Sequence, residues 1–184
     1  MAKEGWAPLH ISATNGHEAI TRLLLQSKAV INAQTTDGNT PLHYAAKEGK
    51  EKTTKLLLDY KASVDTQNND GNTPLHFAAG SAEEKTTKLL LQYKASVDIQ
   101  NNDGNTPLHD AAGSAEEKTT KLLLQYKASV DIQNNDGNTT LHYVAKYGGE
   151  KMTKLLLEYN APVDIQNNDG DTPLDILVKR YKVS

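Results

Sequence analysis

The sequence predicts an all-α repeat solenoid, an array in which each repeat buries its apolar face only against its neighbours. The tetrapeptide TPLH, or a close variant of it, begins at Thr40, Thr73, Thr106, Thr139 and Thr172, at a constant step of 33 residues. The tripeptide LLL recurs at the same step, beginning at 23, 56, 89, 122 and 155. A fixed period of this size is typical of solenoids. Only ten of the 184 residues are Phe, Tyr or Trp, which favours many small, similar contacts over one large core.

Each repeat is predicted to contain two helices and a turn. The segment DGN supplies a tight turn, in which Gly takes the position most in need of a positive φ. The following Thr is a good N-cap, and Pro suits the first helical position because no N–H is needed there. Leu-His-x-Ala-Ala then forms a short first helix, and KTTKLLLxY forms the second. The segment ASVDIQNN is extended and leads to the next turn.

These motifs resemble those of the ankyrin repeat family, whose 33-residue repeat carries the TPLHxA signature found here. The resemblance implies stacked antiparallel helix pairs with β-turn fingers that project from one edge. It covers residues 1–184 as a single array. Five full repeats and a C-terminal half repeat are expected, at 4–36, 37–69, 70–102, 103–135, 136–168 and 169–184.

Two departures from the family pattern predict an array less stable than an idealised one. Threonine pairs such as Thr53-Thr54 replace the usual large β-branched pair of the second helix, and each hydroxyl then needs a partner, for example the carbonyl one turn back. The usual Gly after the second helix is replaced by Lys28, Lys61, Lys94, Lys127 and Asn160. A non-Gly residue in a left-handed C-cap costs about 1 kcal/mol.

Repeats three and four differ from the others at the turn between their helices. Ala82 and Ala115 stand where other repeats have Gly. Ser81 with Glu84 fits a capping box, as does the equivalent pair in repeat four. This pattern predicts that the second helix starts earlier in these two repeats.

Composition argues against several classes of function. The net charge is −3 and no basic run occurs, which argues against a nucleic-acid surface. The chain has no cysteine, so disulfides and thiolate metal sites are excluded. No apolar stretch approaches the ~18 residues of a membrane span, and the start MAKEGWAPLH contains no signal-peptide core. We therefore expect a cytoplasmic monomer that contacts neither nucleic acid nor membrane.

Five histidines recur in the TPLH motif and raise a metal site as an alternative: His10, His43, His76, His109 and His142. Neighbouring helices lie about 8–10 Å apart, whereas zinc holds its ligands at about 2 Å. Successive histidines therefore cannot share an ion. The resemblance implies instead that each His hydrogen-bonds the Thr cap and the adjoining loop.

The acidic turns raise calcium as a second alternative. In IQNNDG the required ligand position four residues before the Asp is occupied by Ile99. No GxSxG, HExxH, phosphate loop or dinucleotide fingerprint occurs. The sequence therefore predicts a protein that is not an enzyme and that needs no metal or cofactor.

The resemblance implies that a protein partner meets the fingers and the outward side of the first helices. Carried over by position, the candidate partner-binding residues are Tyr44, Phe77, Asp110, Tyr143 and Tyr147 on the first helices, and Trp6, Asp70, Asp103 and Asp136 in the fingers. Exposed aromatic side chains are the usual energetic anchors of an interface. The alternative, left open here, is that Tyr44, Phe77 and Tyr143 half-bury against each other as packing.

Phe77 and Asp110 are the only difference between residues 70–102 and 103–135. Burying an unpaired carboxylate costs much free energy, so the side chain at this position is expected to be partly exposed to water in repeat four, with Lys146 as a candidate partner for Asp110.

A separate column of tyrosines ends the second helices: Tyr60, Tyr93, Tyr126 and Tyr159. Rings that cover the rim of a neighbouring repeat, with hydroxyls in water, are favoured there over a ligand-binding ladder.

The leading hypothesis is a non-enzymatic protein–protein interaction module. A second hypothesis is an ankyrin segment of a larger protein, such as an enzyme, a channel or an effector secreted into a host cell, whose activity lies elsewhere. An engineered scaffold is a third, which the threonine pairs and lysine C-caps disfavour because consensus design would not retain them.

Overall fold

A computed structural model describes residues 5–182 of the chain. The described residues contain eleven α-helices and no strand. They fall into two compact units, the first ending at Ser96 and the second beginning at Val97.

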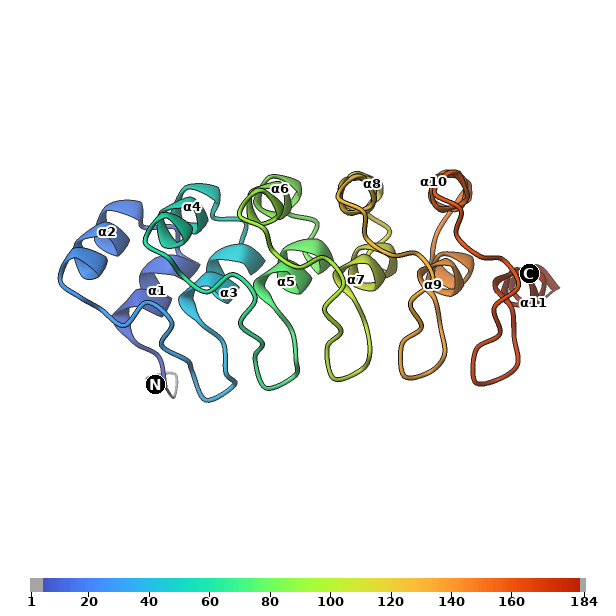
Figure 1. Cartoon of the computed structure of the whole chain (residues 1–184), viewed down its shortest axis with the longest axis horizontal. Coiled ribbons are helices and arrows are strands. Elements are labelled where there is room, and N and C mark those ends of the chain that lie inside the picture. Colours follow the sequence, from blue (N-terminus) through green and yellow to red (C-terminus); the bar gives the residue numbers. More distant parts are fainter. Residues whose placement is uncertain (1–4, 183–184) are drawn as a thin grey trace. The chain divides into compact units, whose positions relative to one another are not determined.

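The first unit contains three helix pairs in two layers (Figure 1). One layer holds the first helices of the pairs: α1 (Pro8–Thr14), α3 (Pro41–Lys47) and α5 (Pro74–Gly80). The other layer holds the second helices: α2 (Glu18–Gln26), α4 (Glu51–Asp59) and α6 (Glu84–Gln92). Within each layer, consecutive helices contact each other, and the two helices of each pair also contact each other.

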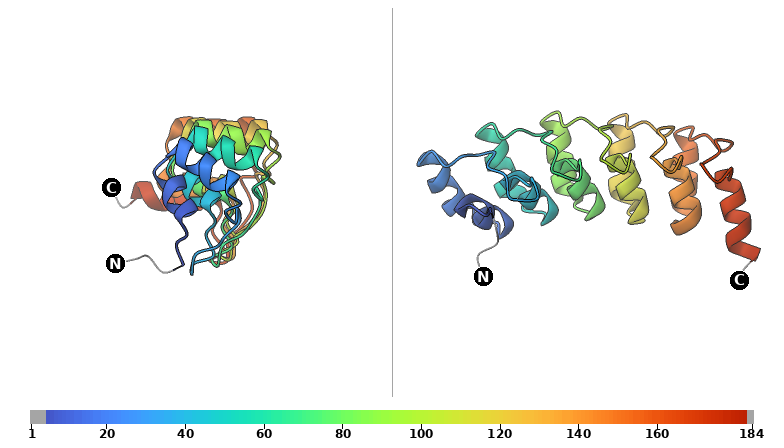
Figure 2. Two further views of the ribbon diagram at one scale, coloured as in Figure 1. Left: turned by 90° about the vertical axis from the view of Figure 1, so that its left-hand side faces the viewer. Right: turned by 90° about the horizontal axis from the view of Figure 1, so that it is seen from below.

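The second unit repeats this arrangement with two pairs and a single helix. Its first helices are α7 (Pro107–Gly113), α9 (Thr140–Tyr147) and α11 (Pro173–Lys182), and its second helices are α8 (Glu117–Gln125) and α10 (Glu150–Glu158). Helix α9 contacts both α7 and α11. The views in Figure 2 show these pairs side by side, with the connecting loops projecting on one side of the helices. The predicted all-α fold of stacked helix pairs is confirmed, while the repeat boundaries within a single array stay predictions.

The core lies between the two layers and is built from the same few residues in every repeat. Leu42, Leu57, Leu75 and Leu90 of the first unit are completely buried. The alanines of the first helices are equally buried, and their small side chains allow the helices to approach closely. Each fully buried leucine contributes roughly 2 kcal/mol from removal of apolar surface from water.

The fingers are tight turns between one helix pair and the next. In the first of them, Gly38 N donates to Thr35 O at 2.9 Å and Thr35 N donates to Asn39 O at 3.0 Å. Gly38 has a φ of +78°, which is the left-handed conformation expected for the Gly of a type I turn followed by a bulge. The glycines of the later fingers share this conformation, with φ values of 77–79°.

The earlier start predicted for the second helices of repeats three and four is wrong. Helix α6 begins at Glu84, one period after Glu51 begins α4. Ser81 is the C-cap of α5 rather than the N-cap of α6. The reason is that Ala82 takes the left-handed conformation, with a φ of 63°, and so performs the turn that Gly49 performs in repeat two.

The lysine C-caps are left-handed as expected, with φ values of 62–70°. The threonine pairs follow the expectation only in part. Thr120 Oγ1 donates to Glu116 O at 2.8 Å, one turn back. Among the described residues, the hydroxyls of Thr53, Thr54, Thr86 and Thr87 are buried and have no hydrogen-bond partner.

Candidate functional site

In the first unit, the outward positions of the first helices carry a short row of rings. The rings of Trp6 and Tyr44 have centroids 4.5 Å apart, and Tyr44 stands edge-on to His10 at 5.9 Å. Phe77 stands edge-on to His43 at 5.8 Å. All three candidate side chains are half-buried. Tyr44 and Phe77 therefore pack on the histidine of the preceding repeat, and Trp6 packs on Tyr44 of the following one. Each ring keeps part of its surface in solvent, so the half-burial of the packing alternative is present together with a surface that a partner could contact.

In the second unit, Tyr143 takes the equivalent position and stands edge-on to His109, with centroids 5.6 Å apart. Its hydroxyl donates to Asn105 Oδ1 at 3.2 Å and accepts from Asn134 Nδ2 at 3.1 Å. Tyr147, one turn later on α9, is half exposed, and its ring centroid is 6.4 Å from that of Tyr143. The side-chain amides of Asn105 and Asn134 thus fix the Tyr143 ring. The Tyr147 ring contacts the Tyr143 ring and remains half exposed.

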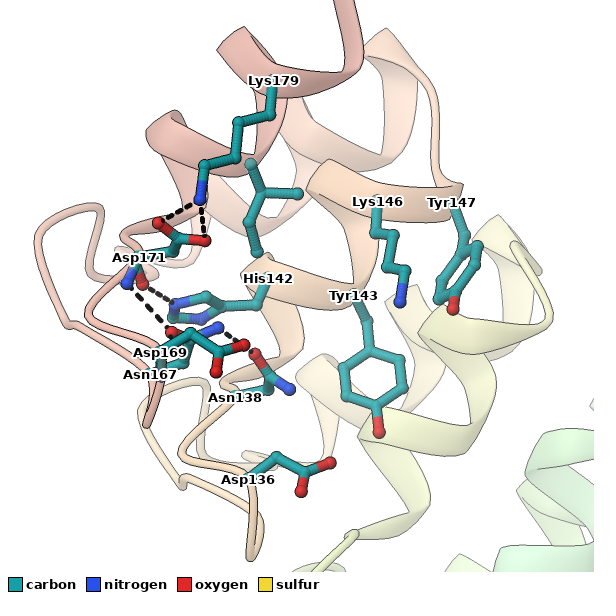
Figure 3. Close-up of a pocket in the computed structure, with 11 residues that line it drawn as sticks. Asp136, Asn138, His142, Tyr143, Lys146, Tyr147, Asn167, Asp169, Asp171 and Lys179 are labelled. Atoms are coloured by element: carbon teal, nitrogen blue, oxygen red, sulfur yellow. Dashed lines mark hydrogen bonds and ion pairs between the residues drawn. The ribbon is translucent and has the colours of Figure 1, made fainter. Parts of the chain in front are cut away.

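These two tyrosines line a hollow of about 500 Å³ beside α9 and α11 (Figure 3). Carboxylates of Asp136, Asp169 and Asp171 lie on the finger side of the hollow. Its other lining residues are Asn138, His142, Lys146, Asn167, Ile176 and Lys179. The hollow therefore presents aromatic, apolar and charged groups to solvent, drawn from the fifth repeat and from the half repeat that follows it.

The charges in this hollow are partly neutralised. Lys179 Nζ lies 2.6 Å from Asp171 Oδ1, and Lys146 Nζ lies over the ring of Tyr147, 5.1 Å from its centroid. No ion pair to Asp136 or Asp169 occurs among the side chains that the structure describes. Two carboxylates thus remain available for a partner.

Asp110 is half-buried on α7, at the position that Phe77 occupies on α5. Burial raises the pKa of its carboxyl to about 7, and the nearby negative charge of Asp103 acts in the same direction. Within the described part of the chain, no ion pair neutralises it. Lys146, the candidate partner, lies over Tyr147 instead. The expectation of a partly wet position agrees with the half-burial of Asp110.

The finger carboxylates Asp70, Asp103 and Asp136 are exposed. The asparagine two residues before each Asp is not exposed, since Asn68 and Asn134 are buried and Asn101 is half-buried. In the hairpin of Asp136, Asn134 Oδ1 accepts from the backbone N–H groups of Asp136 and Asn138 at 3.1 and 2.9 Å. The Asn134 side chain also donates to Asn105 Oδ1 of the preceding finger at 3.0 Å. The acidic side chains are therefore presented outward by turns that asparagine amides hold in place.

The histidine column has the structural role that the resemblance implied. His43 Nδ1 accepts from Thr40 N at 3.1 Å and lies 2.8 Å from Thr40 Oγ1. Because a backbone N–H can only donate, Nδ1 must carry no proton, so Nε2–H donates to Asn72 O at 3.0 Å. Burial lowers the pKa of His43 to about 4, which keeps this neutral tautomer. In the described residues, no group of three or more His, Asp or Glu side chains could hold a metal ion.

The tyrosine column covers the edges of neighbouring repeats. The Tyr93 hydroxyl donates to Asp59 of the preceding repeat, and Asp59 also accepts from Lys55 Nζ at 2.8 Å. Tyr60 and Tyr126 are each more than one third exposed. Tyr93 thus reaches the preceding repeat, as the rim interpretation predicts, but its hydroxyl donates to a carboxylate instead of being solvated by water alone.

Sequence reasoning missed two residues of this region. The sequence predicts only that Asn134 and its repeat equivalents lie in an extended segment before the turn. Their recurrence at the same repeat position was the signal for a shared role. The half repeat carries Asp175 where the other repeats carry His, and its carboxylate accepts from Thr172 N at 2.9 Å and Thr172 Oγ1 at 2.7 Å. The Asp175 carboxylate thus takes the place of the histidine Nδ1 as acceptor at the start of the helix.

The family was tested directly by comparison with known families. A family model of ankyrin repeats in three copies matches residues 1–68 and 52–134. A second ankyrin model, of many copies, matches residues 123–177. The chain belongs to the ankyrin repeat family.

Ankyrin repeats are generally protein–protein interaction modules, are typically non-enzymatic and are commonly intracellular. A search of curated proteins found no match to this chain. None of the described helices combines the length and apolarity needed to span a membrane.

Proposed function

We propose that this ankyrin chain binds a protein partner through the outward side chains of its first helices and through its acidic fingers. The observation that carries the proposal is the hollow beside α9 and α11, in which Tyr143 and Tyr147 face Asp136 and Asp169. Protein–protein interfaces are enriched in tyrosine and other aromatic anchors surrounded by a polar rim, which is the combination that this hollow presents.

The two tyrosines suit different roles in such an interface. Tyr143 is held by Asn105 and Asn134, so little conformational entropy is lost when a partner packs against it. Tyr147 is 53% exposed, and burying it would remove a large apolar surface from water. Tyr147 is therefore the better candidate for an energetic anchor, and Tyr143 for a rigid wall.

The rings of the first unit support the same use of the first helices. Trp6, Tyr44 and Phe77 keep part of their surface in solvent after packing, and Lys47 Nζ lies 5.6 Å from the centroid of Phe77. In repeat four Asp110 replaces the ring, so a partner meets a carboxylate at that point. The exposed Asp70, Asp103 and Asp136 of the fingers would then form the polar rim of the interface.

The proposal can be tested by site-specific crosslinking. A photoreactive phenylalanine analogue placed at Tyr147 should capture a partner protein in extract from cells that express the chain. The same analogue at Tyr126, which is 38% exposed at the end of a second helix, is the matched control. Tyr147→Ala with Asp136→Asn should then weaken the recovered complex at least tenfold, measured with the purified partner.

Capture at Tyr126 but not at Tyr147 would contradict the proposal, as would full affinity in the double variant. Circular dichroism and thermal unfolding of each variant establish that the fold is retained. Both substituted side chains are exposed, so a small effect on stability is expected.

A further inference from the structure

Each of the five fingers contains an Asp-Gly bond. At three of them the Asp carbonyl accepts a hydrogen bond from the finger that follows, and the first of these bonds joins Asn69 N to Asp37 O at 3.0 Å. Asn135 N donates to Asp103 O at 3.0 Å, and Asn168 N donates to Asp136 O at 2.9 Å. Each of these bonds joins the Asp of one finger to the finger that follows. In the part of the chain that the structure describes, no later finger lies against Asp169.

The glycines show the same difference. A side-chain carbon built on Gly104 or Gly137 would lie 2.6 Å from an atom of the following finger, because Asn135 or Asn168 lies directly against the glycine. Gly104 and Gly137 are buried as a result, whereas Gly170 is exposed and nothing lies within 4 Å of the equivalent point. The following finger thus shields the Asp-Gly peptide from solvent in the inner fingers only.

An Asp-Gly bond is chemically the most reactive type of aspartyl bond, because glycine offers no side chain to hinder attack. The Gly nitrogen attacks Cγ of the Asp, the new N–Cγ bond forms, and one water molecule leaves. The resulting succinimide then takes up one water molecule and opens to aspartate or to isoaspartate. No other reactant is consumed. The backbone must rotate for the nitrogen to reach Cγ, so contacts that hold the turn slow the reaction.

We propose that Asp169-Gly170 is a site of spontaneous isoaspartate formation in the folded protein, and that Asp103-Gly104 and Asp136-Gly137 are protected by the finger that follows each. Gly170 N donates to Asn167 O at 2.9 Å, as the inner glycines do to their own turns. The turn itself is therefore the same, and the missing neighbour is the difference. The six residues IQNNDG are identical at all three positions, and the first local difference is Asp171, where the inner fingers have Asn.

Isoaspartate at this position would change the candidate binding surface. Asp169 lines the hollow beside α9 and α11. Isomerisation inserts the Asp169 methylene group into the backbone, and the free carboxylate is then attached directly to Cα. The modification itself is independent of what the hollow binds.

The test is incubation of the whole chain at neutral pH and body temperature for several weeks, followed by peptide mass spectrometry that distinguishes isoaspartate by electron-transfer fragmentation. Asp169 should accumulate isoaspartate several-fold faster than Asp103 and Asp136. In concentrated urea the three rates should be equal, because the sequences around them are nearly identical. Equal rates in the folded protein would overturn the inference. A faster rate at Asp169 that persists in urea would also overturn the inference. The cause would then be the local sequence, in which Asp171 replaces the asparagine of the inner fingers.

Two variants sharpen the test. Asp169→Glu should abolish the signal at this position and leave the other two rates unchanged, because the larger ring forms much more slowly. Asn168→Ala removes the side chain that covers Gly137, so the rate at Asp136 should rise while the rate at Asp103 stays the same. An unchanged rate at Asp136 would contradict shielding by the Asn168 side chain and would assign any protection to the backbone of the following finger, whose Asn168 N–H still donates to Asp136 O in this variant.

Discussion

The histidines of the first helices and the threonine pairs of the second helices are both polar and both buried, yet they differ in how their polar atoms are satisfied. His43 is 1% exposed and makes hydrogen bonds through both ring nitrogens. Thr54 is 0% exposed, and its hydroxyl has no partner among the described residues. A satisfied buried polar group adds stability and fixes geometry, whereas an unsatisfied one costs about 1–3 kcal/mol. The histidines therefore stabilise the first helices, whereas the threonine pairs Thr53-Thr54 and Thr86-Thr87 lower the stability of the second helices.

The largest effect should come from removal of one histidine. His43→Ala would leave Thr40 N and Thr40 Oγ1 without their bonds to the ring, and would remove one of two bonds to Asn72 O, which also accepts from Asn68 N at 2.9 Å. We expect the free energy of unfolding to fall by about 3 kcal/mol or more, as measured by urea denaturation. His17→Ala is the control, because His17 is exposed and lies outside the column. A loss below 1 kcal/mol for His43→Ala would show that the histidine network contributes little.

The second effect is the pH dependence of stability. The pKa of His43 is about 4 in the folded chain and 6.5 ordinarily, so between these values the unfolded chain binds a proton that the folded chain does not. Stability from His43 is present above pH 6.5 and is lost as the pH falls towards 4, by about 3 kcal/mol in total. Burial also lowers the pKa of His10 and His142, which adds to the loss in acid.

Asp110 should act in the opposite direction. Its pKa is raised from 3.8 to about 7, so the folded chain holds a proton that the unfolded chain has released, and stability from this group is lost as the pH rises towards 7. Asp110→Asn removes that loss. Thermal unfolding of wild type and Asp110→Asn across pH 5–8 should therefore show a gap that widens with pH in favour of the variant. A constant gap would contradict the pKa difference.

A smaller effect is expected from the threonine pairs. Thr54→Val keeps the shape of the side chain and removes an unsatisfied hydroxyl, so the free energy of unfolding should rise by about 1 kcal/mol. Thr120→Val is the matched control at the equivalent position, since Thr120 Oγ1 already donates to Glu116 O. The control should gain less than Thr54→Val. Equal changes in denaturation midpoint would mean that the hydroxyl of Thr54 is satisfied in solution.

The smallest effect concerns the turn that joins the two layers. Ala82 has a φ of 63°, so Ala82→Gly should relieve strain and raise the free energy of unfolding by about 0.5–1 kcal/mol. Ala78→Gly, inside helix α5, should lower it by about 1 kcal/mol. The two glycine variants should thus shift the melting temperature in opposite directions. A shift in the same direction would contradict the left-handed conformation of Ala82.

The fold could be predicted from the sequence because its signals are local and repeated in phase. Turn residues, Thr-Pro helix starts and the LLL motif recur at one step of 33 residues, and each feature fixes the backbone near itself. The predicted start of α6 failed where two local signals competed. A capping box at Ser81 and a left-handed turn at Ala82 cannot both hold, and the packing of the pair selects the turn.

By itself, the sequence determined the period, the helix pairs, the finger turns and the positions that face outward. Only the tertiary structure decided which of those positions work together. It placed Asn134 under the Tyr143 hydroxyl, gathered Tyr147, Asp136 and Asp169 around one hollow, and left Asp110 half-buried. These outcomes depend on contacts between repeats, about 30 residues apart in the chain, and no local propensity encodes them. Phe77 and Asp110 have the same local sequence around them, so what each one meets is decided by its neighbours in space.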